Sequence, residues 1–180
     1  MPPQRVQVDG NVRAFSAVPT NPNNIFVLGQ DGNLWLEQGP FGNVPPSRLQ
    51  VDANVRSFYA QDLWAWVWVL GTDGNLWLEF SPFGNVPPKR DLVDGNVLAF
   101  QPLDINTVIV LGTDGNLWLE NSPFGKPPPQ RQQMDGNVME FLATDSSNVL
   151  VLGTDGKLWW EQAPFGKVPP ARKLVDRTVA

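Results

Sequence analysis

Short apolar runs separated by turn residues recur along the whole chain. One nearly continuous apolar run appears four times, at residues 25–28, 67–70, 108–111 and 149–152. A β-branched run this short is typical of a strand that is covered on both faces. Each run is followed by an Asp-Gly turn and by a Leu-Trp segment that ends in Glu. Because Asp-Gly and Gly-Asn are two-residue turn pairs of hairpins, the pattern predicts two antiparallel strands joined by a tight turn.

Two further segments flank each predicted hairpin. A Val-x-x-Phe segment precedes it, as at residues 12–17, and a polar Arg-x-x-(Val/Met) segment follows it. The polar segment suits the edge of a sheet, where one side of the strand faces water. No window of the sequence carries an apolar period of 3.6 residues, so helices are not expected. Each unit therefore predicts four short strands.

Three sequence markers repeat in phase. The Asp of the hairpin turn stands at Asp31, Asp73, Asp114 and Asp155, in steps of 42, 41 and 41 residues. A second marker, Asp-(Gly/Ala)-Asn-Val-x-x-Phe, recurs in steps of 43, 42 and 41 residues, and a third, Pro-Phe-Gly, in steps of 42, 41 and 41. Four antiparallel strands in each repeat of this length predict an all-β protein, a β-propeller built from four blades of about 42 residues. A β-trefoil would need three repeats, and a helical solenoid would need the missing helical period.

The repeats divide one predicted domain, residues 1–180, at about 9–51, 52–93, 94–134 and 135–176. Residues 1–8 resemble a fifth copy of the polar outer strand and would compete with Arg172–Val175 for one edge of the fourth blade. The hairpin from the fourth blade closes the shorter loop and so costs less entropy. Two arrangements follow: four blades in one ring, or two chains in a ring of eight blades.

The composition removes most chemistry. The chain has no Cys and no His, which excludes thiolate or imidazole metal sites, disulfides and His-based catalysis. The formal charge of −5 argues against nucleic acid as a partner. No signal peptide or membrane-spanning run is recognisable, so no membrane association is expected and the compartment is undefined. We expect no cofactor, no metal and no enzyme activity.

Several side chains repeat with the strands. One Trp stands in each third strand, and its flanking Leu residues favour the core over a sugar-stacking platform, although both interpretations stay open. The four are Trp35, Trp77, Trp118 and Trp159. The Glu that ends each third strand precedes an Arg by 11 residues. Adjacent antiparallel strands would bring each pair together as an ion pair or as a clamp for hydroxyl groups. The Asp residues of the turns are interpreted as turn formers, and Asp9, Asp52, Asp94 and Asp135 converge if the ring closes.

Repeat two departs from the pattern. It carries aromatic residues where the other repeats are mostly polar, at Tyr59, Trp64, Trp66 and Phe80. Exposed aromatic clusters on soluble proteins usually mark a contact surface. We therefore list these four residues, with the four repeated Trp residues, as candidate ligand-binding residues, the alternative being local packing of the loop between the first two strands.

The phrase Gly-Thr-Asp-Gly-x-Leu-Trp at residues 71–77, 112–118 and 153–159 resembles the repeats of bacterial and fungal propeller lectins of the tectonin and tachylectin type. The resemblance implies non-catalytic binding of glycans or glycoconjugates in repeated shallow sites on or between blades. The Pro-Phe-Gly-x-x-Pro-Pro loop is not typical of those lectins, so no individual sugar contact is transferred. The alternative function is a protein-interaction or self-assembling scaffold, with a homo-oligomer as one form.

Overall fold

The computed structural model describes residues 7–18, 21–42, 46–60, 65–126, 129–168 and 170–176. These residues form β-strands and connecting turns and contain no helix. No helix capable of crossing a bilayer occurs in these ranges. Sixteen strands are present in the described part of the chain: β1 (Val12–Ala17), β2 (Asn24–Gly29), β3 (Leu34–Gln38), β4 (Ser47–Asp52), β5 (Val55–Ala60), β6 (Trp66–Gly71), β7 (Leu76–Phe80), β8 (Lys89–Asp94), β9 (Val97–Pro102), β10 (Thr107–Gly112), β11 (Leu117–Asn121), β12 (Gln130–Asp135), β13 (Val138–Asp145), β14 (Asn148–Gly153), β15 (Leu158–Gln162) and β16 (Arg172–Asp176).

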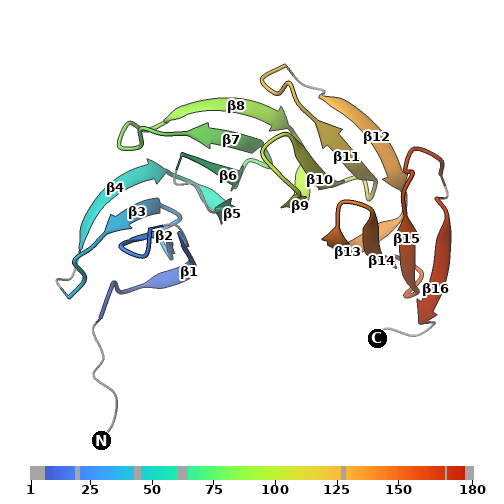
Figure 1. Ribbon diagram of the computed structural model, residues 1–180, viewed down its shortest axis with the longest axis horizontal. Helices are drawn as coiled ribbons and strands as arrows, with labels where there is room; N and C mark the ends of the chain where they lie inside the picture. Colours follow the sequence, from blue (N-terminus) through green and yellow to red (C-terminus); the bar gives the residue numbers. More distant parts are fainter. Residues whose placement is uncertain are drawn as a thin grey trace, which may run out of the picture. The chain divides into compact units, whose positions relative to one another are not determined.

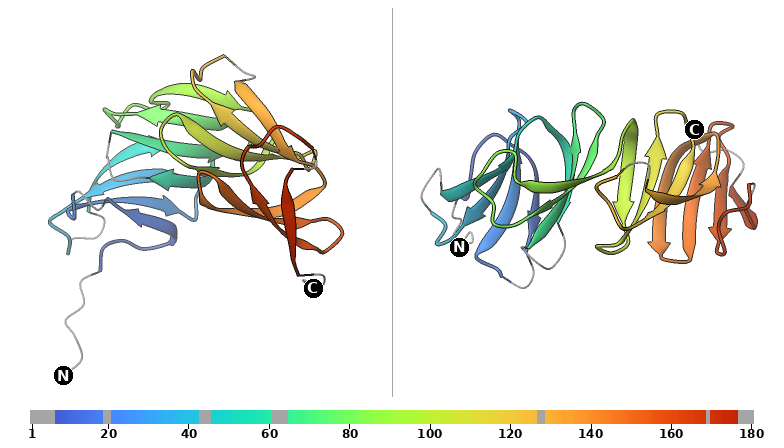
Figure 2. Two further views of the ribbon diagram at one scale, coloured as in Figure 1. Left: turned by 45° about the vertical axis from the view of Figure 1, so that its right-hand side comes forward. Right: turned by 90° about the horizontal axis from the view of Figure 1, so that it is seen from above.

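The strands form four separate sheets of four strands each. In every sheet the strands are neighbours in the order in which they occur along the chain, as in β1-β2-β3-β4 (Figure 1). Neighbouring strands pair in antiparallel orientation, as do β14 and β15, where Val151 lies opposite Trp159. The right-hand view of Figure 2 shows the last four strands side by side. Each sheet is a propeller blade, numbered 1 to 4 along the chain, and the predicted all-β propeller of four blades is confirmed.

The hairpin between the second and third strands of each blade is present, but its turn is longer than predicted. Four residues, not two, separate β6 from β7. Asp73 explains the difference, because its Oδ1 accepts a hydrogen bond of 3.0 Å from the backbone N–H of Asn75. Its Oδ2 accepts a second bond of 2.7 Å from the side-chain amide of Asn75. Two backbone bonds close the same turn, from the N–H of Gly71 to the carbonyl oxygen of Asn75 at 2.9 Å and from the N–H of Gly74 to that of Gly71 at 3.1 Å. The carboxylate adds to these bonds, which agrees with the interpretation of these Asp residues as turn formers.

A second turn, just before the first strand of each blade, depends on asparagine. The four Asn residues at this point have positive φ angles of 55° to 57°: Asn11, Asn54, Asn96 and Asn137. Asn is among the few residues other than Gly that enter this left-handed region at low cost. The Asp-x-Asn-Val marker of the sequence is therefore a turn signature.

The described chain divides into two compact units, residues Met1–Asp91 and Leu92–Ala180, with the division inside β8. The first unit contains blade 1 and blade 2 up to Asp91, and the second contains the end of β8 with blades 3 and 4. The sequence-based expectation was a single domain over residues 1–180.

Each unit has an apolar core between its two blades. In the first unit, Leu34 and Val51 of blade 1 are buried in one cluster with Val55 and Val69 of blade 2. In the second unit, Leu117 and Met134 of blade 3 cluster with Val138 and Val151 of blade 4. The residues correspond by repeat position. We call the side of a blade that carries the Leu34 and Val51 positions its trailing face, and the side that carries the Val55 and Val69 positions its leading face.

The outer edge of blade 4 is formed locally. β16 pairs with β15, with Glu161 opposite Arg172. The short loop between these strands makes this the pairing of lower entropic cost, as expected from the sequence. Of the proposed extra outer strand at residues 1–8, only residues 7 and 8 are described, and they are not in a strand; residues 1–6 lie outside the described residues.

Candidate functional site

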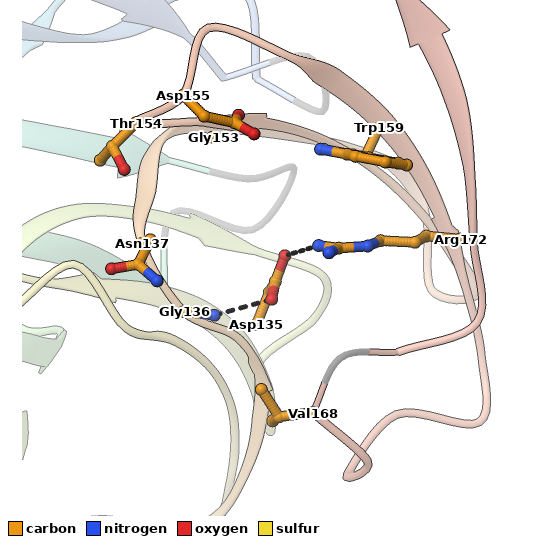
Figure 3. A pocket seen from close by; sticks show the side chains of 9 residues that line it. All are labelled: Asp135, Gly136, Asn137, Gly153, Thr154, Asp155, Trp159, Val168 and Arg172. Atoms are coloured by element: carbon orange, nitrogen blue, oxygen red, sulfur yellow. Dashed lines mark hydrogen bonds and ion pairs between the residues drawn. The ribbon is translucent and has the colours of Figure 1, made fainter.

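Each blade carries a hollow at the same place. Its walls come from the turn before the first strand, the turn between the second and third strands, the repeated Trp and the repeated Arg. Figure 3 shows the hollow of blade 4, which has a volume of about 370 Å³. The other hollows have volumes of about 740, 350 and 260 Å³ in blades 1, 2 and 3. In blade 4 the hollow is lined by Asp135, Asn137, Thr154, Asp155, Trp159 and Arg172.

The repeated Trp forms one wall of each hollow and is stacked against the repeated Arg. The Arg Cζ atom lies 4.1, 4.0, 4.4 and 4.3 Å from the ring centroid in blades 1 to 4. Figure 3 shows the planes of Trp159 and Arg172 one above the other. The four indoles are half-buried, so they are neither a fully enclosed core nor a free stacking platform. One face of each ring is covered by a cation, which the ring quadrupole attracts.

The same Arg binds an Asp at the wall of the hollow. Arg172 Nη1 donates a hydrogen bond of 2.9 Å to Asp135 Oδ2 in blade 4. Asp135 ends β12, the last strand of blade 3, so this ion pair joins two successive blades. Arg90 makes the corresponding bond of 3.2 Å to Asp52. Arg131 Nη1 lies 3.2 Å from Asp94 Oδ2, whereas Arg48 Nη1 and Asp9 Oδ2 are 3.8 Å apart.

The repeated Glu lies beside this pair, as the sequence predicted. Glu37 pairs in register with Arg48, Glu120 with Arg131 and Glu161 with Arg172. The Arg is closer to its Asp than to its Glu, however; in blade 4 the Arg172 Nη1 atom is 2.9 Å from Asp135 and 4.0 Å from Glu161. The repeated ion pair is thus mainly an Arg–Asp pair, with the Glu completely buried behind it.

Burial changes the charge of these Glu residues. Removal from water and, to a lesser extent, the neighbouring Asp of the same pocket raise the pKa of Glu79, Glu120 and Glu161 to about 9 and that of Glu37 to about 7. Among the described residues, the carboxyl oxygens of these four Glu residues have no hydrogen-bond partner. The raised pKa of Glu79 favours its protonated form, and a neutral carboxyl can act as a donor towards the neighbouring Asp52.

The two turns at the rim of each hollow are bonded to each other. The backbone N–H of Thr72 donates to the carbonyl oxygen of Asn54 at 2.8 Å, and equivalent bonds of 2.8 Å join Thr113 to Asn96 and Thr154 to Asn137. In blade 1, Gln30 replaces the Thr and makes the same bond at 2.9 Å. The rim is therefore fixed by the backbone, and the exposed Thr hydroxyl is left facing the hollow as a donor and acceptor.

The structure describes three of the four aromatic residues that set repeat two apart, and it buries one of them. Trp66 was expected to be exposed but is 7% exposed, and its position in β6 gives the reason: this strand is covered on both faces. It lies opposite the half-buried Phe80. Tyr59 is 38% exposed. Trp64 lies outside the described residues. The structure thus corrects the expectation for Trp66, and none of the three described residues lines one of the four hollows.

The sequence analysis left two features of the hollows unnoticed. It paired each Glu with Arg but did not include the Asp contributed from before the first strand, nor the proton on the Glu. Asp, Glu and Arg recur in phase in every repeat, which is a signal that they act together but does not specify that the Asp lines the hollow of the following blade. The Asp residues do not stand as free ligands: Asp52, Asp94 and Asp135 each bind an Arg. In the described ranges no group of three or more His, Cys, Asp or Glu residues is placed to hold a metal ion.

Comparisons with known proteins support the fold. No protein-family model matches the chain, and no curated protein matches it. Among solved structures, the N-terminal domain of Nup159 is similar with a TM-score of 0.60 and 11% identity, over 94% of this chain and 44% of that one. The dihydro-heme d1 dehydrogenase NirN is similar with a TM-score of 0.58 and 19% identity, over 91% of this chain and 36% of that one. Human WBSCR16 is similar with a TM-score of 0.54 and 16% identity, over 91% of this chain and 50% of that one.

These similarities establish a β-propeller fold. At identities of 11% to 19% they carry no information about ligand, and they do not bear on the resemblance to propeller lectins. The chain spans half or less of the length of the structures that it matches.

Proposed function

We propose that the chain is a non-catalytic carbohydrate-binding propeller in which each blade offers one shallow site. The observation that carries the proposal is the fourfold repetition of a hollow with the same polar groups in its walls. Each hollow combines an Arg–Asp pair, an indole, an Asn turn and, in three blades, a Thr hydroxyl. Sugars present many hydroxyl groups that need both donors and acceptors, and these walls supply both.

Size and rigidity are consistent with this ligand class. The hollows of blades 1, 2 and 4 measure about 740, 350 and 370 Å³, within the range of roughly 300–1,000 Å³ typical of small-ligand sites. The rim is held by backbone bonds and the Arg is held between Trp and Asp, so binding requires little ordering of the protein. The lectin-like repeat sequence points to the same ligand class.

Catalysis is disfavoured by the repetition itself. Glycosidases use two carboxyl groups in different environments, one protonated and one ionised, flanking one bond. Here the Glu of each site is completely buried and the Asp beside it is bound to an Arg, so the two carboxyl groups do not flank a space for a scissile bond, and the same arrangement is repeated along the chain. We therefore propose binding, with weak single sites combined into higher avidity on glycan surfaces.

A glycan array tests the proposal, together with a variant that changes the pockets only. The triple substitution Thr72→Val, Thr113→Val and Thr154→Val keeps the shape of three exposed side chains and removes their hydroxyl groups. We expect wild-type protein to bind a subset of glycans and the variant to lose most of that signal. Thr144→Val, at an exposed position of β13 outside the hollows, is the matched control and should bind as wild type does. Folded wild-type protein that binds no glycan would overturn the proposal.

The second candidate is an interaction or self-assembling scaffold. Exposed apolar side chains on blades 1 and 4 favour it.

A further inference from the structure

Two blade faces in this protein carry apolar side chains that are more exposed than their repeat equivalents. The leading face of blade 1 has Phe15 at 74% exposure and Val12 at 36%. The trailing face of blade 4 has Val175 at 55% exposure, with Leu158 half-buried beside it. All four are apolar, and large apolar side chains gathered on one face of a soluble protein mark a contact surface.

The equivalent residues within each unit are covered by the adjacent blade. On leading faces, Val55 of blade 2 and Val138 of blade 4 correspond to Val12 and are at most 3% exposed. On trailing faces, Val51 of blade 1 and Met134 of blade 3 correspond to Val175 and are fully buried. The same repeat positions therefore build a sealed interface wherever a leading face meets a trailing face.

Backbone polarity matches in the same way. Within the first unit, the N–H of Val55 on a leading face donates to the carbonyl oxygen of Gly32 in the preceding blade at 2.9 Å. In the second unit, Val138 donates to Gly115 at 2.9 Å. The repeat equivalents at the two exposed faces are the N–H of Val12, a donor, and the carbonyl oxygen of Gly156, an acceptor. The exposed faces thus match each other in apolar character and in their backbone donor and acceptor, and neither supplies both the donor and the acceptor itself.

We propose that the trailing face of blade 4 docks against the leading face of blade 1 of a second copy of this chain. The choice of a second copy follows from the comparisons, because the four blades cover only 44% of the Nup159 chain and 36% of the NirN chain. The chains of these similar propellers are therefore more than twice as long as the part that the four blades match. In a pair of copies, the trailing face of blade 4 of each copy meets the leading face of blade 1 of the other, so both exposed faces of each copy are covered. Such a head-to-tail arrangement forms a closed ring when the rotation between the copies allows it.

Sedimentation equilibrium or light scattering at micromolar concentration measures the result directly. The expected mass is twice the 19.9 kDa of one chain. A mass of 19.9 kDa would overturn the proposal, whether the faces stay uncovered or the chain covers its own ends. A ladder of species larger than the dimer would also overturn it, since such a contact does not close with two copies.

Two single variants test which faces meet. Phe15→Glu places a charge on the leading face of blade 1, and Val175→Lys places one on the trailing face of blade 4. Both residues are more than half exposed, so each variant is expected to fold and to sediment as a monomer. Mixing the two variants restores one interface in which both faces are wild type, and the second interface then joins Glu to Lys. The mixture should therefore regain the dimer mass, which a like-to-like contact between two leading faces would not allow.

Leu98→Arg is the matched control. It adds a charge at an exposed apolar residue of β9 whose equivalents in blades 1 and 2 are already Arg13 and Arg56. This variant should remain dimeric. Dissociation of Leu98→Arg, or a mixture of the two face variants that stays monomeric, would contradict the proposed pairing of faces. Glycan binding is read separately, so failure here leaves the proposed function untouched.

Discussion

The guanidinium group of Arg90 lies 4.0 Å from the centroid of the Trp77 ring and reaches Asp52 at 3.2 Å. One side chain thus forms part of the wall of a hollow and ties the last strand of blade 1 to blade 2. Arg suits this position because a planar, delocalised cation stacks on an indole and donates to a carboxylate at the same time.

The first prediction follows from this double role. Arg90→Ala should lower the free energy of unfolding by about 1–3 kcal/mol, because Asp52 loses its charged partner in a largely buried position. Arg90→Lys should recover only part of that loss, since an ammonium group does not stack in the same way. Urea unfolding measures both. Arg56→Ala, at an exposed position of β5, should change stability by less than about 0.5 kcal/mol. An equal effect of Arg90→Ala and Arg56→Ala would show that the tie does not matter.

The second prediction concerns pH. The pKa of Glu79, Glu120 and Glu161 is about 9 in the folded protein and returns to an ordinary value of 4.5 on unfolding. The folded state therefore binds more protons between these pH values, so the free energy of unfolding falls as pH rises from 4.5 towards 9. Glu37 contributes over the shorter window from 4.5 to about 7. The Asp residues with lowered pKa, such as Asp114, titrate below 3.8 and lie outside this window.

Urea midpoints at pH 5 and pH 8.5 check this slope. The midpoint should be higher at pH 5. Glu79→Gln keeps a donor towards Asp52 but does not titrate, so it should reduce the slope by up to about 1.4 kcal/mol per pH unit. Glu140→Gln, at an exposed position of β13, is the control and should leave the slope unchanged. Stability that rises steadily between pH 5 and 8.5 would contradict the protonated state of these Glu residues.

The third prediction concerns Trp66. Its replacement by the residue of repeat four, Trp66→Asn, should lower the free energy of unfolding by roughly 3–5 kcal/mol, because a buried indole leaves a cavity. Tyr59→Gln, which introduces the residue of repeat three at a position 38% exposed, should have a small effect. Thermal melting of the two variants separates them. If both melt like the wild type, Trp66 does not pack as the structure describes.

The fourth prediction concerns a glycine at the rim of the hollow. A Cβ atom at Gly71 would lie 2.5 Å from Asp73 Oδ1, the atom that fixes the hairpin turn. Gly71→Ala should therefore displace Asp73, lower the melting temperature and distort the hollow of blade 2. Gly10→Ala is the control, because a Cβ there meets its nearest atom at 3.8 Å and blade 2 already has Ala53 at that repeat position. Equal melting temperatures for the two Ala variants would argue against the role of Asp73.

Much of the fold can be predicted from the sequence, and the reason is physical. Strand periods, turn residues and the phase of the repeats are local properties, so β2, β3 and their equivalents occur where the apolar runs predicted them. The Glu–Arg pairs followed from strand adjacency alone. The propeller fold could be predicted from the number of strands in each repeat.

The remainder depends on depth and on neighbours in other blades. Trp66 looked exposed because its repeat equivalents are polar, yet Asn24 at the same position is also buried. Asp52 belongs to the hollow of blade 2 although it ends a strand of blade 1, a relationship that sequence phase does not specify. The proton on Glu79 follows from burial, which a pattern of polar and apolar residues does not measure.

The proposed function requires the four hollows to be binding sites. Native mass spectrometry with a panel of simple sugars and short oligosaccharides counts the occupied sites directly. The account predicts a ladder of complexes with up to four ligands on each chain for the wild type. The triple Thr→Val variant of blades 2, 3 and 4 should shift that ladder towards one ligand, held by blade 1. Wild-type protein that stays free of every sugar in the panel, or a triple variant with an unchanged ladder, would contradict the assignment of the hollows.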